Sequence, residues 1–356
     1  MDRFVTIIIP AHNQIAYSRQ CVTAVRRNTA PPHKLILVDS GSTDGVGDFF
    51  DSVSGAEVIH LNKNRGFAPA VNAALEHAEG HAVLLHTDTL VPPEWLDRLL
   101  AVLERFPELG LVGPRTNYAP PPQYVEGVDF RGVEKSHGLA QRIAREWDGE
   151  ARFVNRLGSF CVLIREDTWR ALGPLDEAYS PGTYDDDDYC RRAADANYRL
   201  AMAEDVFVFH FGCRTFLGMG ITGRDWNKLV ETNRQRFEQK WRTQTESRPE
   251  TLMKVQELTG AATAAYQRGG VTQAVHLLHA AEKLCPFHER TFNDLGVICR
   301  ELGDTIRAFH YLTRAVRLNP SYEEARDNLR DLAETAGRQE EAEAIIAEVD
   351  AALEPG

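Results

Sequence analysis

Short apolar runs alternate with segments of helical periodicity through the first part of the chain. Four runs have the length of strands: residues 4–10, 34–38, 57–60 and 82–85. The run at residues 82–85 is continuously apolar, as is typical of a strand buried on both faces, and the run at residues 4–10 is rich in β-branched residues. Residues 16–28 and 67–78 have helical spacing, and a shorter helix is expected after the turn at residues 40–44. Strands that alternate with helices in this way predict a parallel, doubly wound sheet.

The pattern continues beyond the fourth strand but becomes less regular. It predicts helices at residues 95–105, 166–172 and 189–197, and strands at residues 110–113, 158–165 and 200–209. Residues 116–150 combine three consecutive prolines, Pro120 to Pro122, with mixed charge and no clear period. We interpret this stretch as a long functional insertion or a lid over the edge of the sheet.

The end of the chain has a different pattern, with a period of 34 residues. The columns of this period are Gly269, Gly303 and Gly337, then Ala274, Ala308 and Ala342, then Leu278, Leu312 and Ile346. Ala281 and Ala315 share a further column, and Pro286 and Pro320 follow them. Small residues at helix contacts, with a proline that closes each second helix, predict stacked helix pairs in about three repeats. The third repeat lacks the alanine and the proline, as a terminal repeat can.

Composition and charge restrict the classes of function. The apolar fraction of 43% and the charged fraction of 26% are ordinary for a folded chain that is long enough for two domains. The net charge of −12 argues against a nucleic acid partner, which requires a basic face. The six cysteines form no C-x-x-C pair, and no apolar run resembles a signal peptide or approaches the ~20 residues of a transmembrane helix. We therefore expect no transmembrane segment and, by default, a cytoplasmic protein.

Two carboxylates directly follow predicted strands. Asp88 comes just past the strand at residues 82–85, and Asp39 reaches the same edge of the sheet from the strand at residues 34–38. Ligands of open α/β sheets bind at this edge, so Asp88 is a candidate ligand for a cation or a sugar hydroxyl. The alternative is that Asp88 only caps the next element, and Ser42 and Asp44 have the same alternative.

Motifs spread over residues 3–217 occur in the order and with the spacing of a known family. They are VTIIIPAHN, LILVDSGSTDG, NRGFAPAVNAAL, VLLHTDT, GSFCVLIR, GPLDEAY, YDDDDYCRRAADANYRL and VFHFG. This series resembles the family 2 glycosyltransferases, which implies a GT-A nucleotide-diphospho-sugar transferase fold with a Rossmann-like mixed sheet. The 34-residue period resembles the tetratricopeptide repeat (TPR), an all-α solenoid. We therefore expect a GT-A domain at residues 1–221, a helical connector at residues 222–250 and a TPR-like domain at residues 251–356.

The resemblance implies a divalent cation at the HTDT motif. Asp88 matches the last carboxylate of the family's D-x-D motif, and His210 resembles a family histidine near the metal and the diphosphate. The first carboxylate of the motif is replaced here by His86. Because imidazole suits Mn²⁺ better than Mg²⁺, Mn²⁺ is the expected ion. The alternative for His86 and His210 is a structural role in which each ring bonds to its neighbours.

The resemblance also implies residues that hold the nucleotide sugar. Asp39 resembles the carboxylate that accepts a hydrogen bond from the nucleotide base. Arg65 could meet the base or the diphosphate with its planar fork of donors, with a surface ion pair as the alternative. The other candidates for binding the nucleotide sugar are Pro10, Ala11, Asn13, Ser42, Gly66 and Thr87.

Four consecutive carboxylates, Asp185 to Asp188, stand at the start of a predicted helix. Those of Asp185 and Asp187 are explained by the favourable interaction of negative charge with the helix dipole. Asp186 aligns with the aspartate of the family's E-D motif, which implies that it is the general base. Repulsion among neighbouring carboxylates is expected to raise one pKa in the cluster and to make that group a better proton acceptor.

These features predict an inverting glycosyltransferase, a hexosyl- or deoxyhexosyltransferase, that moves a sugar from a nucleotide-diphosphate sugar to an acceptor. The repeats favour a protein or peptide acceptor, because glycosyltransferases joined to such repeats include enzymes that modify flagellins and bacteriocin peptides. Residues 250–356 carry 11 Lys and Arg against 18 Asp and Glu, which favours a basic partner. Two alternatives stay open: a polysaccharide or glycolipid enzyme whose repeats form a homodimer, and a scaffold that has lost activity through the change to His86.

Overall fold

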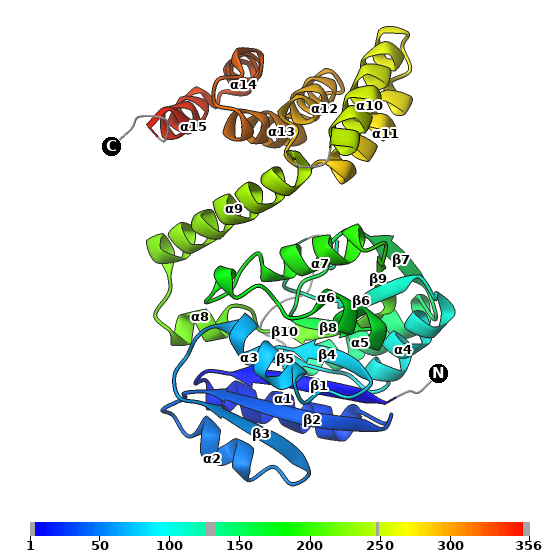
Figure 1. Ribbon diagram of the computed structural model, residues 1–356, viewed down its shortest axis with the longest axis vertical. Helices are drawn as coiled ribbons and strands as arrows, with labels where there is room; N and C mark the ends of the chain where they lie inside the picture. The colour runs from blue at the N-terminus through cyan, green and yellow to red at the C-terminus, as the bar shows by residue number, and fades with distance from the viewer. Residues whose placement is uncertain (1–3, 121, 126–132, 247–248, 352–356) are drawn as a thin grey trace. The chain divides into compact units, whose positions relative to one another are not determined.

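The computed structural model describes residues 4–120, 122–125, 133–246 and 249–351 (Figure 1). The chain forms two compact units, Met1–Arg234 and Gln235–Gly356. The first unit is built around a mixed sheet, and the second is entirely helical in its described residues. This confirms the predicted order of an α/β region followed by a helical region. No helix in the described ranges is both long and apolar enough to cross a membrane.

The main sheet contains eight strands in the described residues, in the order β3-β2-β1-β4-β8-β6-β9-β7. Its parallel half consists of β1 (Val5–Ala11), β2 (His33–Ser40), β3 (Ala56–Leu61) and β4 (His81–Leu85). β8 (Cys161–Ile164) is antiparallel to β4 and to β6 (Leu109–Arg115). β9 (Arg199–Phe207) is parallel to β6, and the edge strand β7 (Ala151–Val154) is antiparallel to β9. The four strands that predicted a parallel sheet are parallel, and the sheet becomes mixed beyond them.

Every residue of β1 is buried, and successive side chains of a strand point to opposite faces of the sheet. Both faces of the sheet must therefore be covered, and helices cover them. Ile7 and Ile9 face a core that includes side chains of α1 (Ile15–Asn28), α2 (Val46–Asp51) and α4 (Trp95–Arg105). Ile8 faces the other core, which includes side chains of α3 (Phe67–Leu75), α6 (Glu166–Leu172) and α7 (Asp185–Asp195). The result is a unit of three layers, with the sheet between two layers of helices (Figure 1).

The stretch at residues 116–150 is more regular than the sequence predicts. It contains α5 (Val133–Glu146), whose Ala140 and Ile143 pack with Phe207 and Phe209. The sequence did not indicate this helix, because the few apolar positions of α5 are interspersed with charged residues that obscure its buried face. Residue 121 and residues 126–132 of the predicted lid lie outside the described residues.

A short antiparallel ladder lies beyond the strand ends. It pairs β5 (Thr89–Leu90) with β10 (Phe209–His210), so that Thr89 is opposite His210. α8 (Arg214–Gly218) and the long α9 (Gly223–Glu246) follow β10. This ladder brings the segment after β4 next to the segment after β9, although the two are far apart in sequence.

The helices of the second unit follow the 34-residue period of the sequence. They are α10 (Pro249–Gln267), α11 (Val271–Leu284), α12 (Glu289–Glu301), α13 (Thr305–Leu318), α14 (Glu323–Ala336) and α15 (Gln339–Ala351). Gly269, Gly303 and Gly337 lie between the two helices of each pair with φ of 81°, 78° and 67°. These backbone angles favour glycine. The alanine and leucine or isoleucine columns are buried, so the sequence period is also a structural period.

Candidate active site

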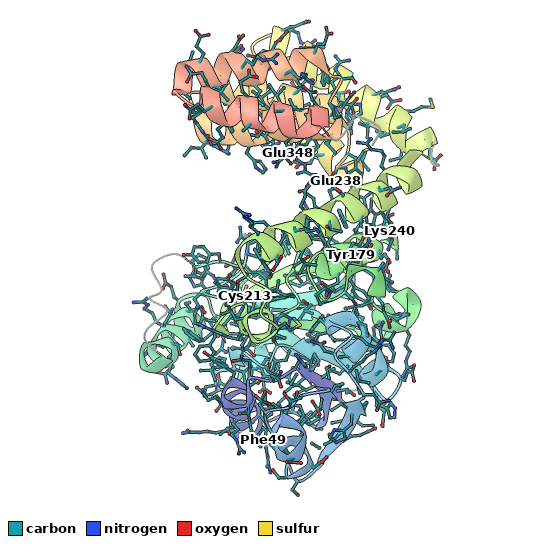
Figure 2. The ribbon with its side chains drawn as sticks, turned by 90° about the vertical axis from the view of Figure 1, so that its left-hand side faces the viewer. Phe49, Tyr179, Cys213, Glu238, Lys240 and Glu348 are labelled. Atoms are coloured by element: carbon teal, nitrogen blue, oxygen red, sulfur yellow. The ribbon has the colours of Figure 1, made fainter. Side chains whose placement is uncertain are left out.

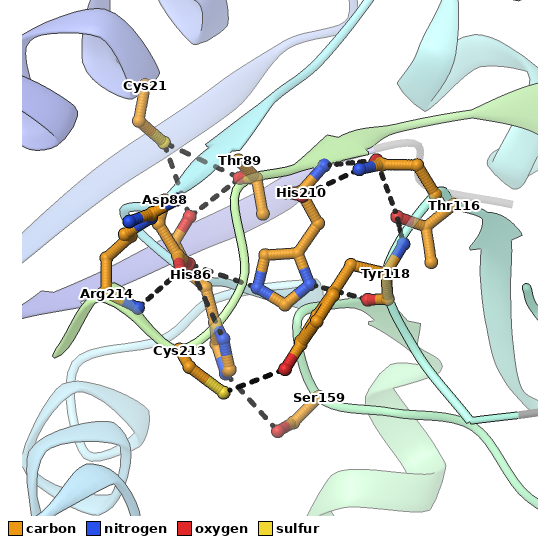
Figure 3. Close-up of polar contacts among 11 residues, drawn as sticks. Cys21, His86, Asp88, Thr89, Thr116, Tyr118, Ser159, His210, Cys213 and Arg214 are labelled. Atoms are coloured by element: carbon orange, nitrogen blue, oxygen red, sulfur yellow. Dashed lines mark hydrogen bonds and ion pairs between the residues drawn. The ribbon is translucent and has the colours of Figure 1, made fainter. Parts of the chain in front are cut away.

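His86, Asp88 and His210 lie together at the carboxyl ends of the strands (Figure 3). β4 ends at Leu85 and leaves His86 and Asp88 in the loop that follows, while the β5–β10 ladder places His210 opposite Thr89. Nε2 of His210 is 3.2 Å from Oδ1 of Asp88, and Nδ1 of His86 is 3.9 Å from the same oxygen. The structure thus brings together the three residues that the sequence analysis nominates as metal ligands.

His210 is oriented through its other ring nitrogen. Nδ1 is 2.8 Å from the carbonyl oxygen of Tyr118. Because a carbonyl only accepts, Nδ1 carries a proton and donates it. In a neutral ring, Nε2 then presents its lone pair to Asp88, and this buried atom has no hydrogen-bond partner in the described part of the chain. A histidine that donates to a carbonyl through one nitrogen leaves the other nitrogen able to ligate a metal, so the three side chains fit a divalent cation.

The surroundings set the protonation of this cluster. Burial lowers the pKa of His86 to about 4, so its ring is neutral near pH 7 and can offer a lone pair. Burial raises the pKa of Asp88, but His210 and His86, which are positively charged in the acidic range where a carboxyl group takes up its proton, outweigh that effect and hold the pKa well below its usual range. The backbone N–H of Arg214 also donates to Oδ2 of Asp88 at 3.2 Å. Asp88 is therefore a carboxylate at every pH at which the protein would work.

A pocket opens over the cluster, and we call it the strand-end pocket. Of the residues that the sequence analysis nominates for the nucleotide sugar, Pro10, Ala11, Gly66 and Thr87 line it. His86, Asp88 and His210 line it as well. Gly66 has φ of 103°, and a Cβ atom there would stand 2.7 Å from Cα of Pro181, so only glycine fits this part of the wall.

Asn13, Asp39 and Ser42 join the loops that follow β1 and β2. The backbone N–H of Asn13 donates to Oγ of Ser42 at 2.8 Å, and the N–H of Ser42 donates to Oδ1 of Asp39 at 2.9 Å. Oδ1 of Asn13 accepts from the N–H of Thr43 at 2.8 Å. These bonds make the three residues part of the frame beside the strand-end pocket, and none of the three is among the residues that line it.

Arg65 also lies outside the lining of the strand-end pocket. One of its terminal nitrogens is 3.0 Å from Oε2 of Glu177, and the exposed fractions of the two side chains are 58% and 42%. This is the surface ion pair that the sequence analysis left open as the alternative for Arg65. Such exposed pairs contribute little to stability, about 0–1 kcal/mol.

Sequence reasoning missed several residues that line the strand-end pocket. They are His12, Asn64, Tyr118, Arg214, Phe216 and Met219. The signal for Arg214 was its position four residues after His210, beyond a turn with φ of 73° at Gly212 and 53° at Cys213. No pattern marked Tyr118, which contributes its backbone carbonyl to His210, because a main-chain contact does not depend on side-chain chemistry.

A second pocket adjoins the first, and we call it the loop pocket. Both pockets are lined by Phe67, His86, Tyr118, Phe216 and Cys213, which is labelled in Figure 2, so the two cavities share a wall. The loop pocket is also lined by the carboxylates of Asp185, Asp186 and Asp187, by Arg156 and Ser159, and by the aromatic rings of Tyr124, Tyr184 and Trp226. The predicted base therefore lies in a cavity next to the histidine and aspartate cluster.

The three carboxylates of the loop pocket differ in their surroundings. Asp185 is buried, its Oδ2 has no hydrogen-bond partner among the described residues, and burial followed by the charge of Asp186 raises its pKa well above the usual range. Asp187 pairs with Arg156, whose Nε is 2.6 Å from its Oδ1. Asp186 is half-buried, and its Oδ1 accepts from the N–H of Asp187 at 3.0 Å. The sequence analysis expects a raised pKa at the proton acceptor; the structure has a raised pKa at Asp185, the most deeply buried of these three carboxylates.

Asn233 of α9 holds the loop that leads into α7. Its Nδ2 donates to the carbonyl oxygens of Tyr179 and Gly182, each at 2.8 Å, and Tyr179 is labelled in Figure 2. The loop then passes through Thr183 and Tyr184 with φ of 75° and 63°, a conformation that most residues avoid. The carbonyl of Pro181 accepts from the N–H of Phe67 at 3.1 Å, so the loop is also bound to the start of α3. These contacts position Asp186.

Comparisons with known proteins place the first unit in a family context. Residues 6–162 match the family described as Glycosyl transferase family 2, a match that ends before Asp186 and His210. Glycosyltransferase AglE of Haloferax volcanii is 27% identical over 218 residues, which cover 58% of this chain and 66% of that protein. Pre-mycofactocin glycosyltransferase of Mycobacterium tuberculosis is 29% identical over 215 residues, which cover 58% of this chain and 43% of that protein. The chain thus spans less than two thirds of the length of these relatives.

Solved structures align over most of the chain, and that of S. aureus TarS is an example. The crystal structure of residues 1–349 of S. aureus TarS covers 94% of this chain and 91% of its own, with 13% sequence identity and a TM-score of 0.48.

Proposed function

We infer that the protein transfers a sugar from a nucleotide-diphosphate sugar to an acceptor. The inference starts from the match of residues 6–162 to Glycosyl transferase family 2. The observation that carries this proposal is the cluster of His86, Asp88 and His210 in the strand-end pocket, next to the loop pocket that contains Asp186. The strand-end pocket is proposed to hold the donor, and the loop pocket the acceptor.

The chemistry divides between the two pockets. His86, Asp88 and His210 would hold a divalent cation, which when bound supplies a Lewis acid for the phosphate oxygens of the donor. Imidazole ligands favour Mn²⁺ over Mg²⁺ at this site. Asp186 accepts the proton of the acceptor hydroxyl as its oxygen attacks the anomeric carbon. The bond from that carbon to the phosphate oxygen breaks on the opposite face, which inverts the configuration and leaves a nucleoside diphosphate.

The acceptor is proposed to be a protein or peptide that the second unit recruits. The support is the 34-residue structural period of α10 to α15, a geometry that resembles tetratricopeptide repeats and offers a continuous helical surface. The competing proposal is that these repeats join two copies of the chain in an enzyme that acts on polysaccharide or glycolipid. A third is that the protein is a scaffold without activity. A cytoplasmic location is part of the proposal, since the six cysteines form no disulfide in the described structure.

Donor hydrolysis tests the activity itself. The full chain is incubated with Mn²⁺ and a panel of UDP-, GDP- and dTDP-sugars, and release of the nucleoside diphosphate is measured. Release from one of them, lost in the Asp88→Ala variant, supports the proposal. The absence of release from every donor, together with the absence of binding of every nucleoside diphosphate, favours the scaffold.

Ending the chain after Glu246 tests the role of the repeats. If they recruit the acceptor, the shortened protein should keep slow donor hydrolysis and lose transfer to a protein acceptor. If they join two copies, its mass by light scattering should halve while transfer to a short acceptor persists. Circular dichroism must first show that the shortened chain is folded, and normal transfer to a protein acceptor by a folded protein would rule out recruitment.

A further inference from the structure

The strand-end pocket contains a single permanent cation among the described residues that line it. His12, His86 and His210 contribute imidazoles, but Arg214 is the one arginine or lysine in the lining. A donor diphosphate brings about two negative charges, and Asp88 adds a third. A divalent cation offsets two of these charges, so one more positive group is needed for the pocket to approach neutrality.

Arg214 is held in place by its backbone and not by an ion pair. It begins α8, and its N–H donates to Oδ2 of Asp88 at 3.2 Å. Its Nε is buried and has no hydrogen-bond partner among the described residues. Its guanidinium carbon lies 5.5 Å from the centre of the Tyr17 ring, a weak contact that leaves the donors of the fork available.

Two other arginines that could be considered for this role, Arg65 and Arg156, already form ion pairs with carboxylates. Arg65 pairs with Glu177 at 3.0 Å, and Arg156 pairs with Asp187 at 2.6 Å. Within the described ranges no ion pair engages Arg214. A buried guanidinium nitrogen without a partner is costly, about 1–3 kcal/mol or more, unless a ligand satisfies it.

We propose that Arg214 binds the diphosphate of the donor and stabilises the nucleoside diphosphate as it leaves. This assignment rests on the proposed function and adds a residue that neither the motifs nor the family match indicates. As the bond from the anomeric carbon to the phosphate oxygen breaks, its electron pair stays on that oxygen and the acceptor proton moves to Asp186. The guanidinium of Arg214 meets the charge that develops on the phosphate, and its planar fork suits two phosphate oxygens.

The competing explanation is that Arg214 only packs against Tyr17. The two roles differ in what they do to nucleotides of different length. A diphosphate-binding arginine affects nucleoside diphosphates and leaves nucleoside monophosphates nearly unaffected, because the monophosphate lacks the second phosphate. A packing arginine affects both nucleotides equally or affects neither.

Calorimetric titration of the full chain distinguishes the two roles. UDP, GDP and dTDP are titrated with Mn²⁺ and again with EDTA, and the monophosphate of the base that binds is titrated for comparison. We expect Arg214→Gln to weaken diphosphate binding by roughly 10- to 100-fold and to change monophosphate binding little. Arg214→Lys should recover part of the loss, since it restores the charge without the fork. The variant keeps the backbone N–H that contacts Asp88, so the metal cluster is preserved.

Arg19→Gln is the matched control, because this substitution removes the same charge from another arginine that lies near an aromatic ring. Arg19 is exposed on α1, and its guanidinium carbon is 4.5 Å from the centre of the Phe49 ring. It should bind the diphosphate as the parent does. Equal binding of the diphosphate by Arg214→Gln and the parent would overturn this inference and leave the proposed function intact. If the parent bound none of the three diphosphates, the proposed function would fail and this inference with it.

Discussion

The strand-end pocket and the loop pocket share a wall but are built differently. The first stands on the ends of β1, β2 and β4, strands whose residues are almost all buried in the core. The second stands on loops and helix ends, including the turn through Thr183 and Tyr184 with its positive φ angles. The sheet therefore holds one wall of the strand-end pocket, whereas the loop pocket depends on a few side chains such as Asn233. Damage to one pocket should leave the other working.

Removing the proposed base should have the largest effect. Asp186→Asn keeps the shape of the side chain but cannot accept a proton, so transfer should fall by about 10²–10⁴-fold. Donor affinity, measured by calorimetry, should stay close to that of the parent because the strand-end pocket is intact. Asp187→Asn is the control in the same turn of α7, and it should cost less because it weakens the ion pair to Arg156 and leaves the proposed base in place. Transfer by Asp186→Asn at the parent rate would show that another group is the base.

Removing the carboxylate of Asp88 should instead affect the binding of the nucleoside diphosphate. Asp88→Ala is expected to weaken nucleoside diphosphate binding with Mn²⁺ on the order of 10²-fold, and much less in EDTA. Excess EDTA should stop turnover by the parent, and Mn²⁺ should restore it better than Mg²⁺ because two of the three proposed ligands are imidazoles. Full turnover in excess EDTA would remove the cation from the mechanism.

Asn233 does not line the loop pocket, but it holds the loop that leads to Asp186, so its substitution should disturb the pocket indirectly. Asn233→Ala removes the hydrogen bonds of Nδ2 to Tyr179, Gly182 and Thr183 in the loop before α7 and should let Asp186 shift. We expect kcat to fall by about 10- to 100-fold, since small misplacements of a reacting group have effects of this size, with little change in donor affinity. Asn227→Ala, an exposed asparagine of the same helix, is the control. An equal loss of donor affinity in Asn233→Ala would mean that the two pockets are not independent.

The contrast between the pockets also explains what the sequence could predict. The strands, the loop after β4 and the cluster of His86, Asp88 and His210 follow from apolar runs and motifs, because the sheet imposes its periodicity on the sequence. The anchoring of the loop pocket by Asn233 does not, since a hydrogen bond between distant segments leaves no local pattern. For the same reason α9, predicted as part of a connector at residues 222–250, contributes Trp226 and Asn233 to the first unit.

The smallest expected effect concerns stability, and it arises from the buried carboxyl group of Asp185. Its pKa is raised in the folded state, so the folded protein binds the proton of this group more tightly than the unfolded chain does. The contribution of this group to stability is therefore fully present below the unfolded pKa and is lost as the pH rises through the folded pKa. Above that pH the fold must bury a charged oxygen, Oδ2, that has no hydrogen-bond partner in the described structure.

Asp185→Asn should consequently stabilise the protein at pH 8 and have little effect near pH 4. The cost of an unsatisfied buried group, about 1–3 kcal/mol, exceeds the loss of a favourable charge at a helix start, about 0.3–1 kcal/mol, so the net gain at pH 8 should be about 1 kcal/mol. Asp187→Asn, which breaks the ion pair to Arg156, should instead destabilise the protein. Urea unfolding of the three proteins at several pH values measures these differences. A gain for Asp185→Asn that does not grow with pH would mean that the raised pKa is not what limits stability at this position.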